Sequence, residues 1–148
     1  MRRNLIGSIV ASAAIVSMLI GSATVASATH VVELGDTATL LSKGAGLVVP
    51  VEVTCDPDQL PPFPFPPFPS PSPSVSVQVT QRSGNRIAQG FGGAPVTCTG
   101  TPQTVNVQLT AQQAPFKHGT ALATATVFVC DSTGCHSASD TEEIRITK

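Results

Sequence analysis

The sequence predicts an all-β protein that folds as an antiparallel β-sandwich of seven or eight strands, with a proline-rich insert and an N-terminal signal helix. Short segments in which apolar and polar residues alternate recur at regular spacing, with turn residues between them. No stretch after residue 28 has the 3.6-residue periodicity of a helix. Finally, Gly119 to Lys148 reads as two long strands that fold back at Cys130 to Cys135.

The first 28 residues have the features of a secretory signal peptide. Arg2 and Arg3 precede an apolar run from Leu5 to Val25, which is followed by the small residues Ala26-Ser27-Ala28. Cleavage there leaves residues 29–148 as a single domain, which we expect to be secreted and extracellular. An uncleaved membrane anchor is the alternative, because the apolar run is long enough to span a bilayer.

The charge of the expected mature chain is slightly negative. Loss of Arg2 and Arg3 leaves six Lys and Arg against nine Asp and Glu, a net charge of about −3. Because nucleic acids and anionic membranes attract basic proteins, this composition gives no reason to expect either as a partner.

The four cysteines are expected to form two disulfides, since exported proteins fold in an oxidising compartment. The favoured pairs are Cys130 with Cys135, which a hairpin would place on neighbouring strands, and Cys55 with Cys98. The alternative set joins Cys55 to Cys130 and Cys98 to Cys135.

Two strands are predicted before the insert. After a short N-terminal tail, Thr37 to Leu41 is the first and Leu47 to Cys55 the second. Pro50 lies inside the second strand and has no N–H to donate, which predicts an edge position or a bulge.

The proline-rich insert, residues 57–74, interrupts the strand pattern. Nine of its eighteen residues are proline, so it cannot pair as a strand and is expected to adopt polyproline II. Asp56 and Asp58 at its entrance are expected to form a turn, because two carboxylates are too few for a calcium site.

Four further strands are predicted between the insert and the C-terminal pair: Ser74 to Gln81, Arg86 to Gly92, Val96 to Thr99, and Gln103 to Leu109. Ser83-Gly84-Asn85 is predicted to be the turn between the first two. Gly90, Gly92 and Gly93 are expected to weaken the strand that contains them.

The C-terminal strands are predicted from the alternation on either side of the cysteine loop. In the first of them the apolar face is thin, because most of it is alanine; it consists of Ala121, Ala123, Ala125, Val127 and Val129. Gly134 is expected to take the left-handed conformation that the loop requires.

The number and order of the strands resemble an immunoglobulin-like sandwich of the kind found in small secreted actinobacterial proteins. The chain departs from true immunoglobulin domains because it has no Trp and no Tyr, and because Cys98 precedes the strand that would hold the family's second cysteine.

A second resemblance concerns the segments Val129 to Cys135 and Ser137 to Asp140. They are similar to the late hairpin of the enediyne-antibiotic apoproteins, small exported sandwiches with a cysteine pair at the same spacing. The resemblance covers about twelve residues, and the proline-rich insert has no counterpart in it. It implies a cleft for a small apolar ligand, here lined by the alanine-rich face.

No motif predicts an enzyme, a metal site or a cofactor. The sequence lacks a Gly-x-Ser-x-Gly elbow, a phosphate loop, a dinucleotide fingerprint and a His-Glu-x-x-His motif. His136, Ser137, Ser139 and Asp140 contain the groups of a hydrolytic triad, but neighbours along one strand cannot meet as a triad does. Zinc held by the cysteines with His118 or His136 is a weak alternative, since no Cys-x-x-Cys pair is present.

The candidate partner-binding residues are Phe63, Phe65 and Phe68, which lie in the insert and make up half of the phenylalanines in the chain. Either these rings pack back on the domain and cover apolar surface, or they stay exposed on a stiff arm that docks into a partner. A disordered linker is the third possibility.

We therefore expect a secreted, non-enzymatic binding or adhesive module with a polyproline arm, whose partner is a protein or a small apolar ligand. The alternative is a carrier that holds a small apolar ligand in a cleft of the domain.

Overall fold

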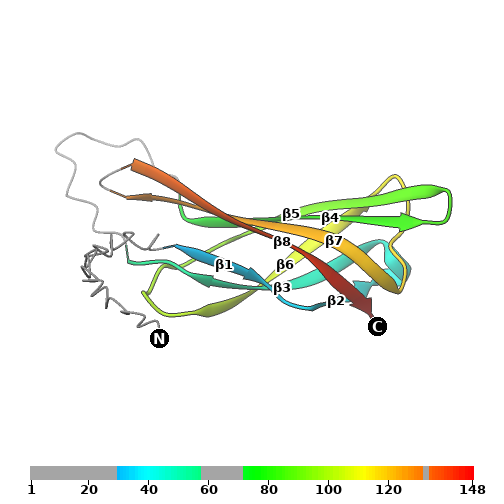
Figure 1. The fold of residues 1–148 in the computed structure, drawn as a ribbon, viewed down its shortest axis with the longest axis horizontal. Helices are drawn as coiled ribbons and strands as arrows, with labels where there is room; N and C mark the ends of the chain where they lie inside the picture. Colours follow the sequence, from blue (N-terminus) through cyan, green and yellow to red (C-terminus); the bar gives the residue numbers. More distant parts are fainter. Residues whose placement is uncertain (1–29, 58–71, 132–133) are drawn as a thin grey trace, which may run out of the picture.

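The computed structural model describes residues 30–57, 72–131 and 134–148, which form eight strands and one short 3-10 helix (Figure 1). The N-terminal half contains β1 (Val31–Leu34), β2 (Thr37–Leu41), η1 (Ser42–Gly44) and β3 (Gly46–Thr54). The remaining strands are β4 (Ser74–Ser83), β5 (Arg86–Pro95), β6 (Gln103–Gln112), β7 (Gly119–Asp131) and β8 (Gly134–Thr147). The all-β prediction is confirmed. The expected signal peptide and most of the proline-rich insert lie outside the described residues.

The strands form one sheet that closes into a seven-stranded barrel. β3 pairs antiparallel with β6 along one edge, and with β1 and β2 along the other. β2 pairs in parallel with β8, and the order then continues through β7, β4 and β5 back to β6. The predicted open, two-sheet sandwich of immunoglobulin type is therefore wrong.

The sandwich prediction failed because closure of the sheet depends on which strand edges pair, whereas the alternating pattern shows only which face of each strand is buried. A strand with one inward and one outward face gives the same alternating pattern in a sandwich and in a barrel. The ring is closed by two short seams of three register pairs each, between β2 and β8 and between β5 and β6. No periodicity in the sequence marks which edges meet.

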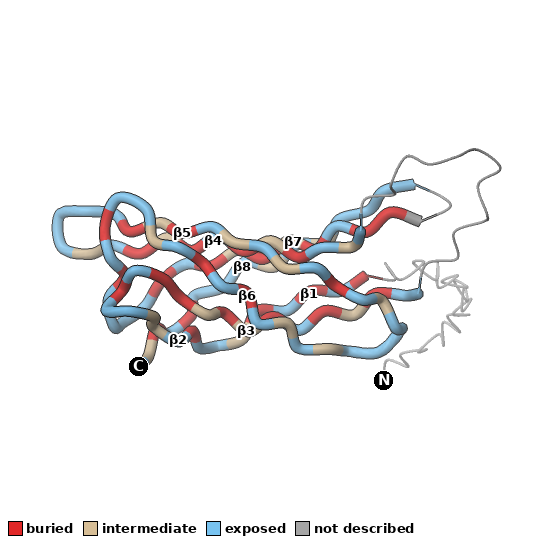
Figure 2. Tube along the Cα trace, turned by 180° about the vertical axis from the view of Figure 1, so that it is seen from behind, coloured by how far each residue is buried: buried red, intermediate tan, exposed pale blue. Residues whose placement is uncertain are grey.

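The core is the interior of the barrel, and Figure 2 shows buried and exposed positions alternating along most strands. The predicted face of β7 is buried, from 5% exposure at Ala121 to none at Ala123, Ala125 and Val127, whereas Leu122 on the other face is 55% exposed. Phe116, in the loop between β6 and β7, is buried and is the largest fully buried side chain among the described residues. A ring from a loop thus contributes volume to a barrel whose β7 wall is mostly alanine.

Pro50 lies in a central strand, so the predicted edge position or bulge is wrong. β3 has neighbours on both edges, and Pro50 is in register with Asn106 of β6. On the opposite edge it faces the gap between β1 and β2, where its carbonyl accepts a hydrogen bond from the Gly35 N–H at 3.0 Å. Because the neighbouring strand is interrupted there, the missing N–H of proline leaves no ladder bond unmade.

The glycines of β5 allow close packing at a barrel seam, in contrast to the weakening expected from sequence. A Cβ atom on Gly90 would lie 2.9 Å from the Phe116 ring, and one on Gly92 would lie 2.1 Å from the Gln108 carbonyl oxygen. Both distances are too short for real side chains, so glycine at these positions lets β6 and the Phe116 ring approach β5.

The loops of the barrel gather at two ends. The flanks of the insert, the loop 96–102 and the Cys130–Cys135 disulfide lie at one end, which we call the disulfide end. η1, the β4–β5 turn, the loop 113–118 and the C-terminus lie at the other. The strand predicted over Val96 to Thr99 is wrong, because these residues belong to the loop between β5 and β6.

Candidate binding end of the barrel

Both stems of the proline-rich insert are fixed to the same loop, 96–102. Cys55 precedes the insert and forms a disulfide with Cys98, with their Cα atoms 4.8 Å apart, while its carbonyl accepts a hydrogen bond from the Gly100 N–H at 2.9 Å. On the other side of the insert, the Pro73 carbonyl accepts a hydrogen bond from the Val96 N–H at 2.9 Å. The barrel therefore holds the insert as a loop with two anchored ends.

A second disulfide closes the β7–β8 hairpin at the same end. Cys130 and Cys135 are register partners with Cα atoms 3.9 Å apart, and Gly134 has the positive φ expected of it, at 144°. The structure thus contains the two pairs that the sequence favoured, Cys130 with Cys135 and Cys55 with Cys98, and not the alternative set.

Two exposed apolar side chains flank the stems of the insert. Val31 is 44% exposed and is the register partner of Thr54, directly before Cys55. Phe128 is 40% exposed and pairs with Ser74, the last residue of the insert. These residues form an apolar rim, Val31 and Phe128, on both sides of the place where the insert leaves the barrel. Alternation along the strand puts Phe128 on the face opposite the alanines, but nothing in the sequence links it to the insert.

The predicted partner-binding residues Phe63, Phe65 and Phe68 lie outside the described residues. The structure does establish where the segment that carries them is attached. Its stems end at the disulfide end, beside the apolar rim.

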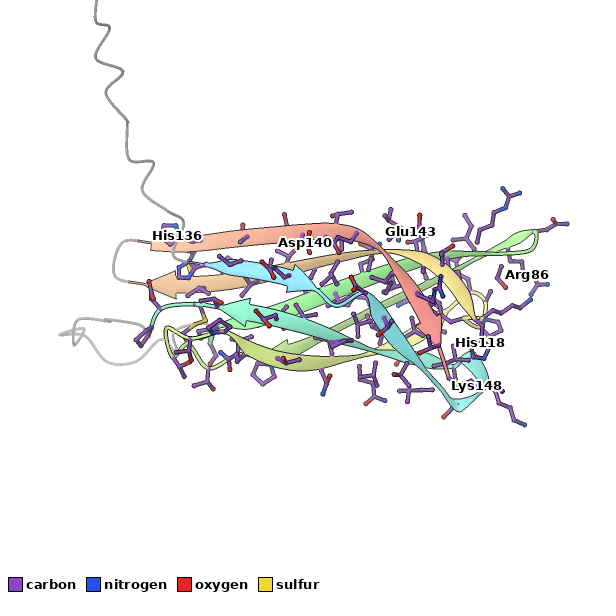
Figure 3. The ribbon with its side chains drawn as sticks, turned by 60° about the horizontal axis from the view of Figure 1, so that its bottom comes forward. Arg86, His118, His136, Asp140, Glu143 and Lys148 are labelled. Carbon is purple, nitrogen blue, oxygen red and sulfur yellow. A yellow bond between two sulfur atoms is a disulfide. The ribbon has the colours of Figure 1, made fainter. Side chains whose placement is uncertain are left out.

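The described residues do not support the zinc alternative. All four cysteine sulfurs are used in disulfides, and His118 and His136 lie at opposite ends of the molecule (Figure 3). His136 does lie near His30, with ring centroids 6.0 Å apart. No cluster of three or more His, Cys, Asp or Glu suited to a metal ion occurs among the described residues.

The described β8 residues do not form a hydrolytic triad. His136, Ser137, Ser139 and Asp140 follow one another along this strand, and each pairs with a different residue of β7. The Asp140 carboxylate instead accepts a hydrogen bond from the Leu34 N–H at 2.8 Å. This carboxylate therefore provides a hydrogen-bond partner for the backbone of β1, which does not pair with β8.

The alanine-rich face of β7 belongs to the core. Ala123, Ala125 and Val127 have no exposed surface, and they share the interior with large side chains such as Phe116 and Leu47. Two hollows among the described residues lie elsewhere, around the β4–β5 hairpin and the adjoining part of β7. A cleft for an apolar ligand along this face would require the core to open.

Gln81 is a structural residue that the sequence analysis missed. It is 4% exposed, on the inward-facing side of β4. Its amide nitrogen donates to the carbonyls of Lys117 and Thr120, at 2.8 and 3.3 Å, and its amide oxygen accepts from the Lys117 N–H at 2.8 Å. The sequence showed only a polar residue at the end of an alternating strand, which is also the usual position for an exposed one.

Comparison of the chain with family models, with curated proteins and with solved structures gave no match. Within the described part of the chain, no helix is both long and apolar enough to cross a membrane. The two disulfides are compatible with an extracellular location.

Proposed function

We propose that the protein is a secreted, non-enzymatic binding or adhesive module that presents its proline-rich insert, with Phe63, Phe65 and Phe68, to a protein partner. The observation that carries this proposal is the attachment of both insert stems to loop 96–102, through one disulfide and two backbone hydrogen bonds.

Anchoring at both ends favours a recognition role over that of a linker. A linker joins two bodies, whereas both ends of this insert return to one barrel. A polyproline segment has little conformational entropy left to lose, so fixing its ends lowers the cost of binding further. The exposed Phe128 beside one stem and Val31 beside the other extend the apolar surface available to a partner.

The test is capture of a partner by an arm variant and by a matched surface variant. The arm variant carries Phe63→Ser, Phe65→Ser and Phe68→Ser. The control carries Ile87→Ser, Phe91→Ser and Leu122→Ser, which removes three side chains that are 51%, 60% and 55% exposed on the barrel wall. Residues 29–148 of each are immobilised and exposed to the extracellular fraction of the source cells, and bound proteins are identified by mass spectrometry.

We expect the arm variant to lose at least about tenfold of a bound protein that the control retains, because apolar anchors dominate such interfaces. The free energy of unfolding of the arm variant, measured with urea, should lie within about 0.5 kcal/mol of the wild type, as for other exposed substitutions. A stability loss above about 2 kcal/mol would show that the rings pack on the barrel and would contradict the proposal.

A further inference from the structure

One outer wall of the barrel is polar but carries no charge. It consists of the outward-facing positions of residues 74–80 in β4, 89–95 in β5 and 106–112 in β6, and we call it the neutral wall. None of these residues is Asp, Glu, Lys, Arg or His, whereas the surface of a soluble protein usually mixes charges of both signs.

The charged side chains of the described residues lie around this wall. The Lys and Arg residues lie toward the end opposite the disulfide end, where Figure 3 shows Arg86 and Lys148. They are Lys43, Arg82, Arg86, Lys117, Arg145 and Lys148. Glu33, Glu52 and Asp56 lie toward the disulfide end, on or directly after β1 and β3. The neutral wall therefore lies between a basic end and an acidic region.

Phe91 lies within the neutral wall and is 60% exposed, more than any other large apolar side chain among the described residues. Its register partners are Gln78 of β4 and Thr110 of β6, and both are exposed. Gln89 and Gly93 are the next outward positions on β5 itself. The ring is thus an apolar platform surrounded by two amides, a hydroxyl and a glycine without a side chain.

Hydroxyl groups continue the polar surface from β4 onto β7. Thr124 is the register partner of Gln78, and its hydroxyl lies 3.0 Å from that of Thr141 on β8. The Ser76 hydroxyl donates to the Thr126 carbonyl at 3.4 Å. These hydroxyl oxygens keep lone pairs that can accept hydrogen bonds, while the glutamine amides supply N–H donors.

This combination matches the chemistry of a neutral sugar. Sugar hydroxyls both donate and accept hydrogen bonds, as amide and hydroxyl side chains do, and the C–H groups of a sugar ring form an apolar face that an aromatic ring can cover. A charged ligand would lose hydration on this wall without meeting a charge of opposite sign.

We propose that the neutral wall binds a neutral polysaccharide, with Phe91 stacked on a sugar ring and Gln78, Gln89 and Thr110 bonded to sugar hydroxyls. A polymer fits better than a single sugar, because an open wall covers one side of a small ligand, whereas a chain contacts several strands at once. The inference is independent of the role proposed for the insert. The control variant of that test removes Phe91 and keeps the insert, so the two sites are tested separately.

The experiment is native affinity electrophoresis of residues 29–148 in gels that contain hydroxyethylcellulose, mannan, dextran or soluble starch, with polygalacturonate as the anionic comparison. We expect at least one neutral polysaccharide to retard the protein relative to a gel without polysaccharide. Phe91→Ala should weaken this binding at least about tenfold, because an aromatic anchor is lost. The matched control is Ile87→Ala, which changes a side chain of 51% exposure on the same face of β5, beside Arg82. It should bind as the wild type does.

Two further variants test the neutrality of the ligand. Gln78→Glu and Gln78→Lys place opposite charges beside Phe91, and both should weaken binding at least about fivefold, because either charge loses hydration against an uncharged sugar. Opposite effects of the two substitutions would overturn the proposal, since they would show that the ligand is charged.

Four other outcomes would also overturn it. The first is that none of the four neutral polysaccharides retards the protein, and the second is equal binding by Phe91→Ala and the wild type. The third is stronger retardation by polygalacturonate than by any neutral polysaccharide. The fourth is self-association of the protein alone, seen in sedimentation velocity and lost in Phe91→Ala, which would assign the neutral wall to a second copy of the chain.

Discussion

Gln81 shows how one polar side chain fixes a loop at the end of the barrel. Its amide makes three hydrogen bonds to the backbone, two to Lys117 in the loop 113–118 and one to Thr120 at the start of β7, so the side chain ties this loop to β4. The same loop contains Phe116, which fills the core. Loss of the amide would leave backbone groups without partners and loosen the segment that carries this ring.

We predict that Gln81→Leu lowers the free energy of unfolding by about 1–3 kcal/mol, because buried backbone groups lose their hydrogen-bond partners. The matched control is Gln78→Leu, the same change on the same strand at an exposed position, which should shift stability by about 0.5 kcal/mol or less. Urea unfolding followed by circular dichroism measures both. Equal effects of the two substitutions would show that the amide contributes no specific stabilisation.

At the scale of elements, the two disulfides constrain the chain over different distances. Cys55–Cys98 spans 43 positions and joins the end of β3 to the loop that holds both stems of the insert. Cys130–Cys135 spans five positions and joins strands that the β7–β8 ladder already pairs. A crosslink stabilises the fold mainly by restricting the unfolded chain, so the longer loop should contribute more.

We predict that Cys55→Ala with Cys98→Ala lowers the free energy of unfolding by about 4 kcal/mol, and that Cys130→Ala with Cys135→Ala lowers it by about 2 kcal/mol, on the loop-entropy model. Each double variant keeps the other disulfide, so the two act as controls for each other. Denaturant unfolding without reductant gives both values. A larger loss from the hairpin pair would show that native-state contacts of this disulfide outweigh its effect on the unfolded chain.

The whole molecule is defined by closure of the sheet and by separation of charge along the barrel. Closure depends on the short β2–β8 and β5–β6 seams, and the second of these needs glycine at position 92, where a Cβ atom would lie 2.1 Å from the Gln108 carbonyl oxygen. The charge separation places an acidic region toward the insert and a basic region at the opposite end. The two ends of the barrel therefore differ in charge.

We predict that Gly92→Ala lowers the free energy of unfolding by about 1–3 kcal/mol, because the added methyl group forces β5 away from β6. Gly93→Ala is the matched control, since the atom nearest to its Cβ would be the Val75 carbonyl oxygen at 3.3 Å. This neighbouring substitution should cost at least about 1 kcal/mol less. Thermal unfolding measures both variants. Equal costs would contradict a closed β5–β6 seam, because position 92 would then have no close contact with β6.

The sequence by itself determined the local structure of the strands. Alternation placed Ala121, Ala123 and Ala125 on a buried face, and the cysteine spacing favoured the pairs that the structure contains. These features depend on residues that are near one another in the chain, or on the side-chain period of two that every half-buried strand shares. The same period puts Phe128 on the opposite, outward face.

Only the tertiary structure decided that the sheet closes, that Pro50 faces a gap between two strands, and that the cations gather at one end. Each depends on which strand edges meet and on the end of the barrel to which each loop returns. Local propensity predicts neither the edge pairing nor the end to which a loop returns, because both depend on residues that are far apart in the chain. The charge pattern is the clearest case: Lys43 and Lys148 are separated by almost the whole domain in sequence, and the barrel brings them to the same end.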